Sequence, residues 1–383
     1  MTDASVCTDL TKQLQRAADE LVESGAERGM QVAVHRHGEL VADIVAGIAD
    51  PATGREVRPD TPFYNFSLGK GVTATLAHVC AERGYFGERG YDTPVADLWP
   101  EFAAHGKQAV TVRHALTHSA GVPGIPAATT HAELCDWDAM CAALADVQPW
   151  WEPGAAVGYH AYTFGYLVGE IVRRTTGRSL TDVLREELTD PLGITDELYF
   201  GMPEAQQHRL ARLEEDPARA AAFDLSQLPD DLPMFRAAPK HLFPSAAFGN
   251  RADILAADIP AGAKTSARAV ARMYAAVLGE VDGVRLLSPE RTREATALAM
   301  SGPDQLMGNE SAWALGYAVG LPHGSAATEP TVFGMAGVGG SWAGADTATG
   351  TAWAITKNVL GANDPTVARI SHIVRNHPAT TTS

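Results

Sequence analysis

The sequence has 383 residues, of which 45% are hydrophobic and 20% are charged. This length exceeds what one hydrophobic core usually serves, so we expect two lobes that share a cleft, and the composition is that of an ordinary globular protein. The net charge of −16 argues against a nucleic-acid partner, because phosphate binding needs clustered basic residues and no basic run is longer than Arg173-Arg174.

Two further features indicate a cytoplasmic protein without a membrane partner. The N-terminal residues lack the apolar run of a secretory signal, and no run of about 18 apolar residues follows. The four cysteines show neither C-x-x-C spacing nor the density of a disulfide framework. We therefore expect plain thiols at Cys7, Cys80, Cys135 and Cys141.

The N-terminal part is predicted to be a helix packed on an antiparallel sheet. A helical pattern covers residues 10–24, and alternating apolar residues on both sides of a turn at residues 37–39 indicate a β-hairpin. After Pro62, apolar residues from Val72 to Cys80 repeat at helical spacing until Gly84. Ser67 is therefore expected at the start of a helix.

Residues 85–260 show mostly helical patterns broken by glycine and proline. Apolar residues from Phe164 to Val172 form one helical face, and Ser179 resembles the N-terminal cap of a following helix. Residues 214–244 contain five prolines and are predicted to form a long irregular loop or a lid.

Strand patterns return in the last third of the chain. A helix is predicted over residues 267–278, and strands over residues 315–319, 331–334 and 351–357, with a turn at 346–350. This order predicts an α/β lobe from both chain ends, with helices flanking an antiparallel sheet, and an all-α insertion lobe. We place the first lobe at residues 1–75 and 262–383, the second at 76–261, and the active site in the cleft between them.

Ser67 and Lys70 are the first candidates for catalysis. A serine and a lysine three residues apart lie on the same face of a helix, close enough for the amine to take the hydroxyl proton. Lysine can act as this base only where burial or a nearby cation lowers its pKa, and a helix N-terminus supplies N–H groups for a developing oxyanion. Taken alone, the same four residues also fit a capping serine followed by a surface lysine.

Four segments together resemble one enzyme family. They are the F-S-L-G-K run at residues 66–70, the T-V-R-H-A-L-T-H-S-A-G run at 111–121, W-E-P-G at 151–154 followed by Tyr159, and G-M-A-G-V-G-G-S at 334–341. They are similar to the motifs of the serine β-lactamase and penicillin-binding superfamily, specifically its class C-like branch with the family VIII carboxylesterases. The resemblance spans about residues 15–360 and implies a β-lactamase/transpeptidase-like fold and an acyl-enzyme on Ser67.

The resemblance also implies roles for further residues. Tyr159 is expected as the second proton-handling group, and Lys70 as a cation of the kind that a phenolate requires. The oxyanion hole is expected from the backbone N–H groups of Ser67 and Val338. Four residues are candidates for substrate contact: His160, Met335, Gly337 and Trp342. Trp342 is the best candidate for the wall of an apolar pocket, whereas His160 fits a structural histidine equally well.

Two departures from the family pattern predict the substrate class. Ala161 stands where the family carries the asparagine of Y-x-N, and Met335 stands where it carries a lysine or histidine. A methionine cannot bind a substrate carboxylate by charge. We therefore expect a carboxylic ester or thioester with an apolar acyl part, rather than a β-lactam, and no cofactor.

Several alternatives stay open at this point. The acyl-enzyme could pass its acyl group to an amine or an alcohol, as a transamidase or acyltransferase of natural-product biosynthesis does, instead of to water. A non-catalytic binding member of the same fold has no chemical need for Ser67, Lys70 and Tyr159 together. His114 and His118 have the spacing of metal ligands on a helix but lack the intervening glutamate of H-E-x-x-H, so no metal is expected.

Overall fold

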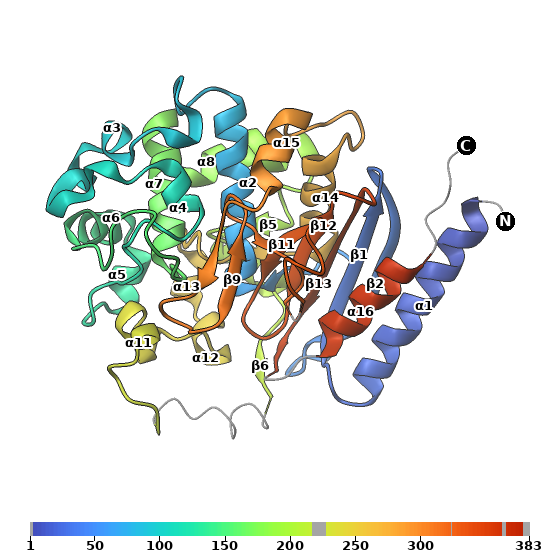
Figure 1. Ribbon diagram of the computed structural model, residues 1–383. Helices are drawn as coiled ribbons and strands as arrows, with labels where there is room; N and C mark the ends of the chain where they lie inside the picture. The colour runs from blue at the N-terminus through green and yellow to red at the C-terminus, as the bar shows by residue number, and fades with distance from the viewer. Residues whose placement is uncertain (1–2, 217–226, 323, 362–364, 378–383) are drawn as a thin grey trace.

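One antiparallel sheet is built from both ends of the chain. The computed structural model describes residues 3–216, 227–322, 324–361 and 365–377. Nine strands lie in the order β3-β2-β1-β13-β12-β11-β10-β9-β8 (Figure 1), and each pairs antiparallel with its neighbours. Their bounds are β1 Gly29–Arg36, β2 Glu39–Asp50, β3 Arg55–Glu56, β8 Met300–Pro303, β9 Glu310–Trp313, β10 Ala318–Val319, β11 Val332–Ala336, β12 Trp342–Asp346 and β13 Thr351–Lys357.

The predicted hairpin forms because its turn residues accept the required backbone geometry. Strands β1 and β2 are joined by His37 and Gly38, which both have positive φ, 48° and 89°. Two-residue hairpin loops need this conformation so that the strands keep their right-handed twist. The hairpin lies beside β13, which comes from the other end of the chain.

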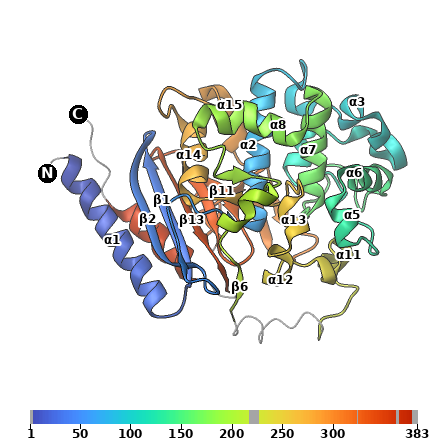
Figure 2. The ribbon, with the colours of Figure 1, turned by 180° about the vertical axis from the view of Figure 1, so that it is seen from behind.

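Helices cover both faces of the sheet. On the outer face lie α1 (Asp3–Glu23) and α16 (Pro365–Asn376), which also contact each other, and both views show them packed together (Figures 1 and 2). The inner face is covered by α14 (Ala267–Leu278), whose N-terminus is capped by the Ser266 hydroxyl. Burial of each large apolar side chain between these layers contributes about 1.5–3 kcal/mol.

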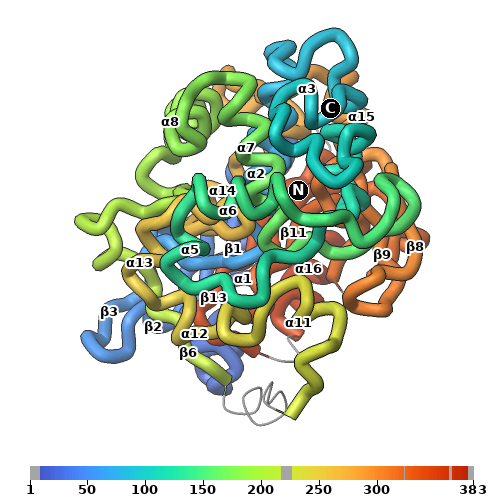
Figure 3. Tube along the Cα trace, turned by 90° about the vertical axis from the view of Figure 1, so that its left-hand side faces the viewer, coloured from blue at the N-terminus to red at the C-terminus, as the bar shows by residue number. Residues whose placement is uncertain are grey.

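The chain between the two sheet-forming parts is mostly helical, as predicted. Figure 3 shows this region toward the viewer, in front of the sheet. The predicted apolar face lies on α7, and Ser179 caps α8 through the Asp182 N–H group. The helices from the nucleophile onward are α2 Gly69–Glu82, α3 Val95–Leu98, α4 Val112–Leu116, α5 His131–Cys135, α6 Trp137–Asp146, α7 Thr163–Thr176, α8 Leu180–Leu184, α9 Asp190–Leu192, α11 Pro233–Ala237, α12 Ala246–Gly249, α13 Ala252–Ala256 and α15 Pro289–Thr296.

A small three-stranded sheet ties the helical region to the nucleophile segment. Its order is β4-β7-β5, with β4 Phe63–Tyr64, β7 Lys264–Thr265 and β5 Leu198–Tyr199. A further parallel pair joins β6 (Glu214–Glu215) to β14 (Val359–Leu360). Because β4 ends two residues before Phe66, this sheet sets the position at which Ser67 enters α2.

The strand predictions for the last third of the chain were incomplete. The helix over residues 267–278 is confirmed, but only Ala318–Val319 is a strand within residues 315–319. Strands β8, β9 and β12 were missed, since these segments are rich in Gly, Ala and Ser and show weak alternation. In the described residues, no helix combines the length and apolarity needed to cross a membrane.

Candidate active site

Ser67 stands on a strained turn between β4 and α2. Phe66 has a φ of +44°, a conformation that non-glycine residues adopt rarely and chiefly at functional sites. The turn is held by Asn65, whose N–H donates to the Ala263 carbonyl at 2.9 Å and whose side-chain amide donates to the Thr265 carbonyl at 3.1 Å. The residues after the turn form a short 3₁₀ helix, Phe66–Leu68, which leads directly into α2. This arrangement presents Ser67 at the N-terminal end of the helix.

Lys70 lies in the first turn of α2 and meets Ser67 as the spacing predicts. Its Nζ lies 3.0 Å from the Ser67 Oγ and donates to the Ala261 carbonyl at 3.3 Å. The side chain is buried, with 1% of its surface exposed, and burial lowers the pKa of the amine to about 7. Near neutral pH a large share of Lys70 is therefore unprotonated and able to accept the serine proton.

Tyr159 completes a cluster of three side chains. It borders the same pocket as Ser67, and the Lys70 Nζ lies 4.8 Å from the centre of its ring. Burial raises the pKa of the phenol above its ordinary value, and an interaction with the Ser67 side chain acts to lower this pKa. Lys70 does not offset this burial, so the phenol stays neutral and Lys70 is the group poised to act as base.

The predicted oxyanion-hole residues also lie beside Ser67. A Cβ on Gly337 would come within 2.0 Å of the Asn65 carbonyl, so only glycine lets the end of β11 approach the nucleophile turn this closely. Val338 follows at once and borders the same pocket as Ser67 and Tyr159. Within the described ranges, neither the Ser67 nor the Val338 N–H group takes part in a backbone hydrogen bond that joins separate elements.

Comparison with known proteins places this arrangement in a family. The profile of the Beta-lactamase family matches residues 14–374. The chain belongs to this family. The esterase/β-lactamase LipL of Mycobacterium tuberculosis is 35% identical over 353 residues, which cover 87% of this chain and 77% of LipL.

Two solved structures of the family superpose closely. A family VIII carboxylesterase has a TM-score of 0.87 and 31% identity, covering 96% of this chain and 98% of its own. A penicillin-binding protein homologue from Caulobacter crescentus has a TM-score of 0.81 and 34% identity, covering 97% and 98%. The predicted resemblance and the β-lactamase/transpeptidase-like fold are therefore confirmed.

The pocket in front of Ser67 has mainly apolar walls. They come from segments far apart in the sequence: the nucleophile turn, the Tyr159 segment, residues 234–248, residues 259–262 and the loop at 306–307. The predicted lid at residues 214–244 falls partly on 217–226, which lie outside the described residues. The remainder supplies pocket residues that the sequence analysis did not single out, namely Met234, Ala237, Ala238, Phe243 and Pro244.

Trp342 does not line this pocket, which corrects the prediction made for it. It lies on β12, and its ring packs against that of Trp353 at a tilt of 41°, with 4.6 Å between ring centres. Both belong to the apolar layer beneath α1 and α16. Because side chains alternate between the faces of a strand, the register of β12 places Trp342 on the outer face, away from Ser67.

His160 is not a substrate ligand either. Its Nε2 accepts the Val122 N–H at 3.1 Å, and its Nδ1 lies 2.6 Å from the Gly158 carbonyl. Burial lowers its pKa to about 4, so the ring is neutral, with both nitrogens used inside the protein. Met335 packs with Val157 and Trp313 in a small apolar cluster next to Tyr159, where it supports the tyrosine rather than forming the pocket wall.

The histidine pair considered as metal ligands has other partners. The His114 Nδ1 accepts the Thr111 N–H at 3.2 Å, and the His118 Nδ1 accepts the His160 N–H at 3.0 Å. Across the part of the chain that the structure describes, no group of three or more histidine, cysteine, aspartate or glutamate side chains is placed to hold a metal ion.

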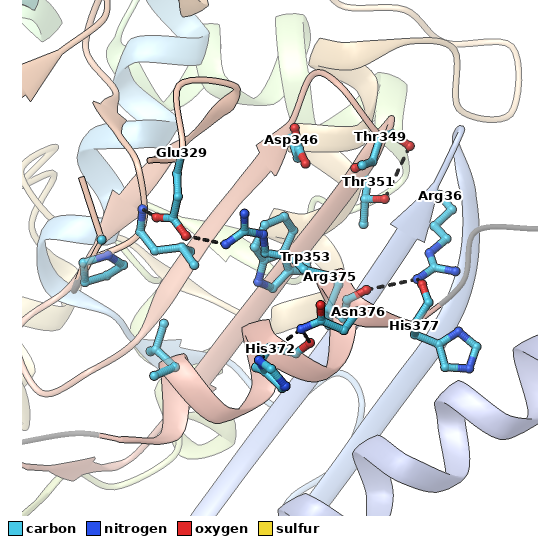
Figure 4. Close-up of a pocket in the computed structure, with 16 residues that line it drawn as sticks. Arg36, Glu329, Asp346, Thr349, Thr351, Trp353, His372, Arg375, Asn376 and His377 are labelled. Atoms are coloured by element: carbon cyan, nitrogen blue, oxygen red, sulfur yellow. Dashed lines mark hydrogen bonds and ion pairs between the residues drawn. The ribbon is translucent and has the colours of Figure 1, made fainter. Parts of the chain in front are cut away.

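A second, polar hollow lies on the opposite face of the sheet, between its strands and α16 (Figure 4). Arg375 pairs there with Glu329, and Arg36 donates to the Val374 and His377 carbonyls at 3.1 and 3.0 Å. The residues that line it include neither Ser67 nor Tyr159. Ser67 and Tyr159 instead border the apolar pocket described above.

Proposed function

We propose that this protein is a serine hydrolase that cleaves carboxylic esters with apolar acyl groups through an acyl-enzyme on Ser67. The observation that carries the proposal is the contact between Ser67 and a buried lysine whose pKa is lowered to about 7. Lysine at its ordinary pKa is protonated at neutral pH and cannot act as a base. The related proteins named esterase and carboxylesterase support the same activity.

The geometry supports the following sequence of steps. Neutral Lys70 accepts the Ser67 proton while the Oγ attacks the ester carbonyl carbon, and the N–H groups of Ser67 and Val338 donate to the oxyanion. The tetrahedral intermediate collapses, the bond to the alkoxy group breaks, and the Tyr159 hydroxyl donates its proton to the leaving alcohol. Lys70 returns a proton to Tyr159. Water then attacks the acyl carbon by the reverse route and releases the carboxylic acid.

The pocket composition favours an ester over a β-lactam. Ala161 borders the pocket without the amide that the family places there, and Met335 is held in an apolar cluster. Neither residue offers a charge or hydrogen bond to a substrate carboxylate. We expect nitrocefin turnover far below that of a p-nitrophenyl ester, and comparable rates for the two substrates would contradict the proposed substrate class.

Acyl transfer is the second candidate, with an amine or alcohol as acceptor. The apolar walls in front of Ser67 limit access of water to the acyl-enzyme, which favours an acceptor that binds the pocket. Retention of the base and the phenol beside the serine argues against a non-catalytic binding member of the fold.

Mass spectrometry of the intact protein after incubation with a p-nitrophenyl ester tests this proposal. An adduct that Ser67→Ala removes, and that decays in water, establishes the esterase. An adduct that persists until a primary amine or alcohol is added establishes the transferase. Absence of any adduct and of any turnover overturns Ser67 as nucleophile.

Two broader assignments accompany this proposal. Strands from both chain ends in one sheet support lobes at residues 1–75 with 262–383 and at 76–261. Free thiols at Cys80, Cys135 and Cys141 support a reducing, cytoplasmic location.

A further inference from the structure

A buried carboxylate lies behind the catalytic tyrosine. Asp304 follows β8 and has only 4% of its surface exposed. Its Oδ2 accepts the backbone N–H of Tyr159 at 2.9 Å. Its Oδ1 accepts the N–H groups of Leu306 and Met307 at 2.9 and 3.0 Å. One carboxylate therefore joins the Tyr159 segment to a loop that reaches the substrate pocket.

The backbone around Tyr159 is held at three consecutive N–H groups. The Gly158 N–H donates to the His118 carbonyl at 3.1 Å, and the His160 N–H donates to the His118 Nδ1 at 3.0 Å. Between them, the Tyr159 N–H donates to the Asp304 carboxylate, its one hydrogen-bond partner among the described residues. The position of the phenol at Ser67 therefore depends on this carboxylate as well as on His118.

The Oδ1 atom of Asp304 holds part of the pocket wall in place. Leu306 and Met307 both border the apolar cavity in front of Ser67. Their loop is closed by Asp304 itself, since its N–H donates to the Asn309 carbonyl and its carbonyl accepts the Gly308 N–H, both at 2.8 Å. The same residue thus orders the loop that contributes part of the acyl-group wall.

We propose that Asp304 is a positioning residue that holds the Tyr159 phenol at Ser67 and, through the same carboxylate, fixes the Leu306–Met307 wall of the acyl pocket. This inference rests on the proposed esterase function. It implies that turnover and acyl-chain preference depend on one side chain that touches neither the ester nor the nucleophile.

Only a carboxylate can perform both tasks at this position. Its two oxygens are acceptors only, and they receive three N–H groups in the protein interior. An asparagine of the same shape has one oxygen and one NH₂ group. In Asp304→Asn, the NH₂ group must face either the Tyr159 N–H or the loop N–H pair, so one of the two connections is lost.

The test compares Asp304→Asn with a matched control. Asp346 is also a buried aspartate, 6% exposed, and its Oδ1 accepts the Ala348 N–H at 2.9 Å on the distant polar hollow (Figure 4). We expect Asp346→Asn to keep the wild-type kcat within about twofold, because a substitution far from the active site seldom affects turnover. We expect Asp304→Asn to lower kcat roughly ten- to a hundredfold, the loss typical of a displaced catalytic group.

A double-mutant comparison separates positioning from a general structural effect. If Asp304 acts through Tyr159, Tyr159→Phe with Asp304→Asn has about the same kcat as Tyr159→Phe alone. Losses that multiply in the double variant overturn the positioning role. If Asp304→Asn does not fold, Asp304→Glu, which keeps the charge but displaces both oxygens, is used in the same comparison.

The effect of Asp304 on acyl-chain preference is tested with three substrates: p-nitrophenyl acetate, butanoate and octanoate. We expect Asp304→Asn to change the ratio of octanoate to acetate kcat/KM by at least about threefold, because the Leu306–Met307 wall shifts. Tyr159→Phe should leave this ratio unchanged. An unchanged ratio in Asp304→Asn overturns the pocket role. Wild-type protein without a Ser67 adduct would instead overturn the proposed function, so the two failures are distinguishable.

Discussion

Two buried lysines of this protein have similarly lowered pKa values but different hydrogen-bond partners. Lys70 and Lys264 are both fully buried, and burial lowers the pKa of each amine to about 7. Each Nζ also lies 4.8 Å from the centre of a tyrosine ring, that of Tyr159 for Lys70 and that of Tyr64 for Lys264. Burial and pKa therefore do not distinguish the two.

Their hydrogen-bond partners do distinguish them. Lys70 meets the Ser67 hydroxyl, whereas Lys264 donates to the Phe200 and Ile254 carbonyls. A carbonyl oxygen has no proton to give, so Lys264 can join chain segments but cannot activate a nucleophile. A lowered pKa marks a candidate base, and the group within reach decides whether it becomes one.

The largest expected effect separates the two lysines by turnover. Lys70→Met removes the base and should lower kcat/KM for a p-nitrophenyl ester by roughly 10³- to 10⁴-fold. Lys264→Met should lower it less than about tenfold, because this lysine contacts no reacting group. Steady-state kinetics on folded protein, verified by circular dichroism, measures both. Equal losses in the two variants would show that burial rather than contact with Ser67 matters.

Lys70 is predictable from the sequence, whereas Lys264 is not. Serine and lysine three residues apart are neighbours whenever the segment is helical, so the local spacing together with the family motifs predicted that contact. The burial of Lys264 depends on pairing of β7 with β4 and β5, three short strands from distant parts of the chain. No local sequence pattern indicates strands this short, so the burial of Lys264 could not be predicted from the sequence.

Trp342 and the pocket walls show the same limit. The family resemblance located Val338 and Tyr159 by motif, but without β12 the side of the sheet that Trp342 faces could not be assigned. The pocket residue Met234 lies on the short helix α11, and Leu306 lies in a turn after β8. Both segments are too short to show a helical or strand periodicity in the sequence. They meet only through tertiary packing, so sequence spacing could not bring them together.

The pH dependence of acylation is a second test that distinguishes Lys70 from Lys264. With a Lys70 pKa of about 7, kcat/KM should fall about tenfold per pH unit well below pH 7 and level off above it, because only the neutral amine accepts the Ser67 proton. Lys264→Met should keep the same midpoint. A profile that is flat from about pH 5 to pH 8, measured by release of p-nitrophenol, would contradict Lys70 as the base.

The smallest expected effect concerns the pH dependence of stability, and it is the same for both lysines. The pKa of Lys264 is about 7 in the folded protein and 10.5 as a free side chain. Between about pH 7 and pH 10.5, the Lys264 amine is protonated in the unfolded chain but largely neutral in the folded protein. The free energy of unfolding therefore rises as the pH increases through this window and falls as the pH decreases toward 7.

Replacing Lys264 with methionine removes this contribution to the pH dependence. Urea unfolding of wild type and Lys264→Met from about pH 7 to pH 9 should show a shallower rise in the variant, by at most about 1.4 kcal/mol per pH unit. Lys70→Met should flatten the curve in the same way, since its amine is shifted in the same direction by the same cause. Parallel curves for wild type and Lys264→Met would mean that this amine stays charged in the folded protein. Of these two lysines, Lys70 would then be the one whose amine its surroundings keep largely neutral above pH 7, in contact with Ser67.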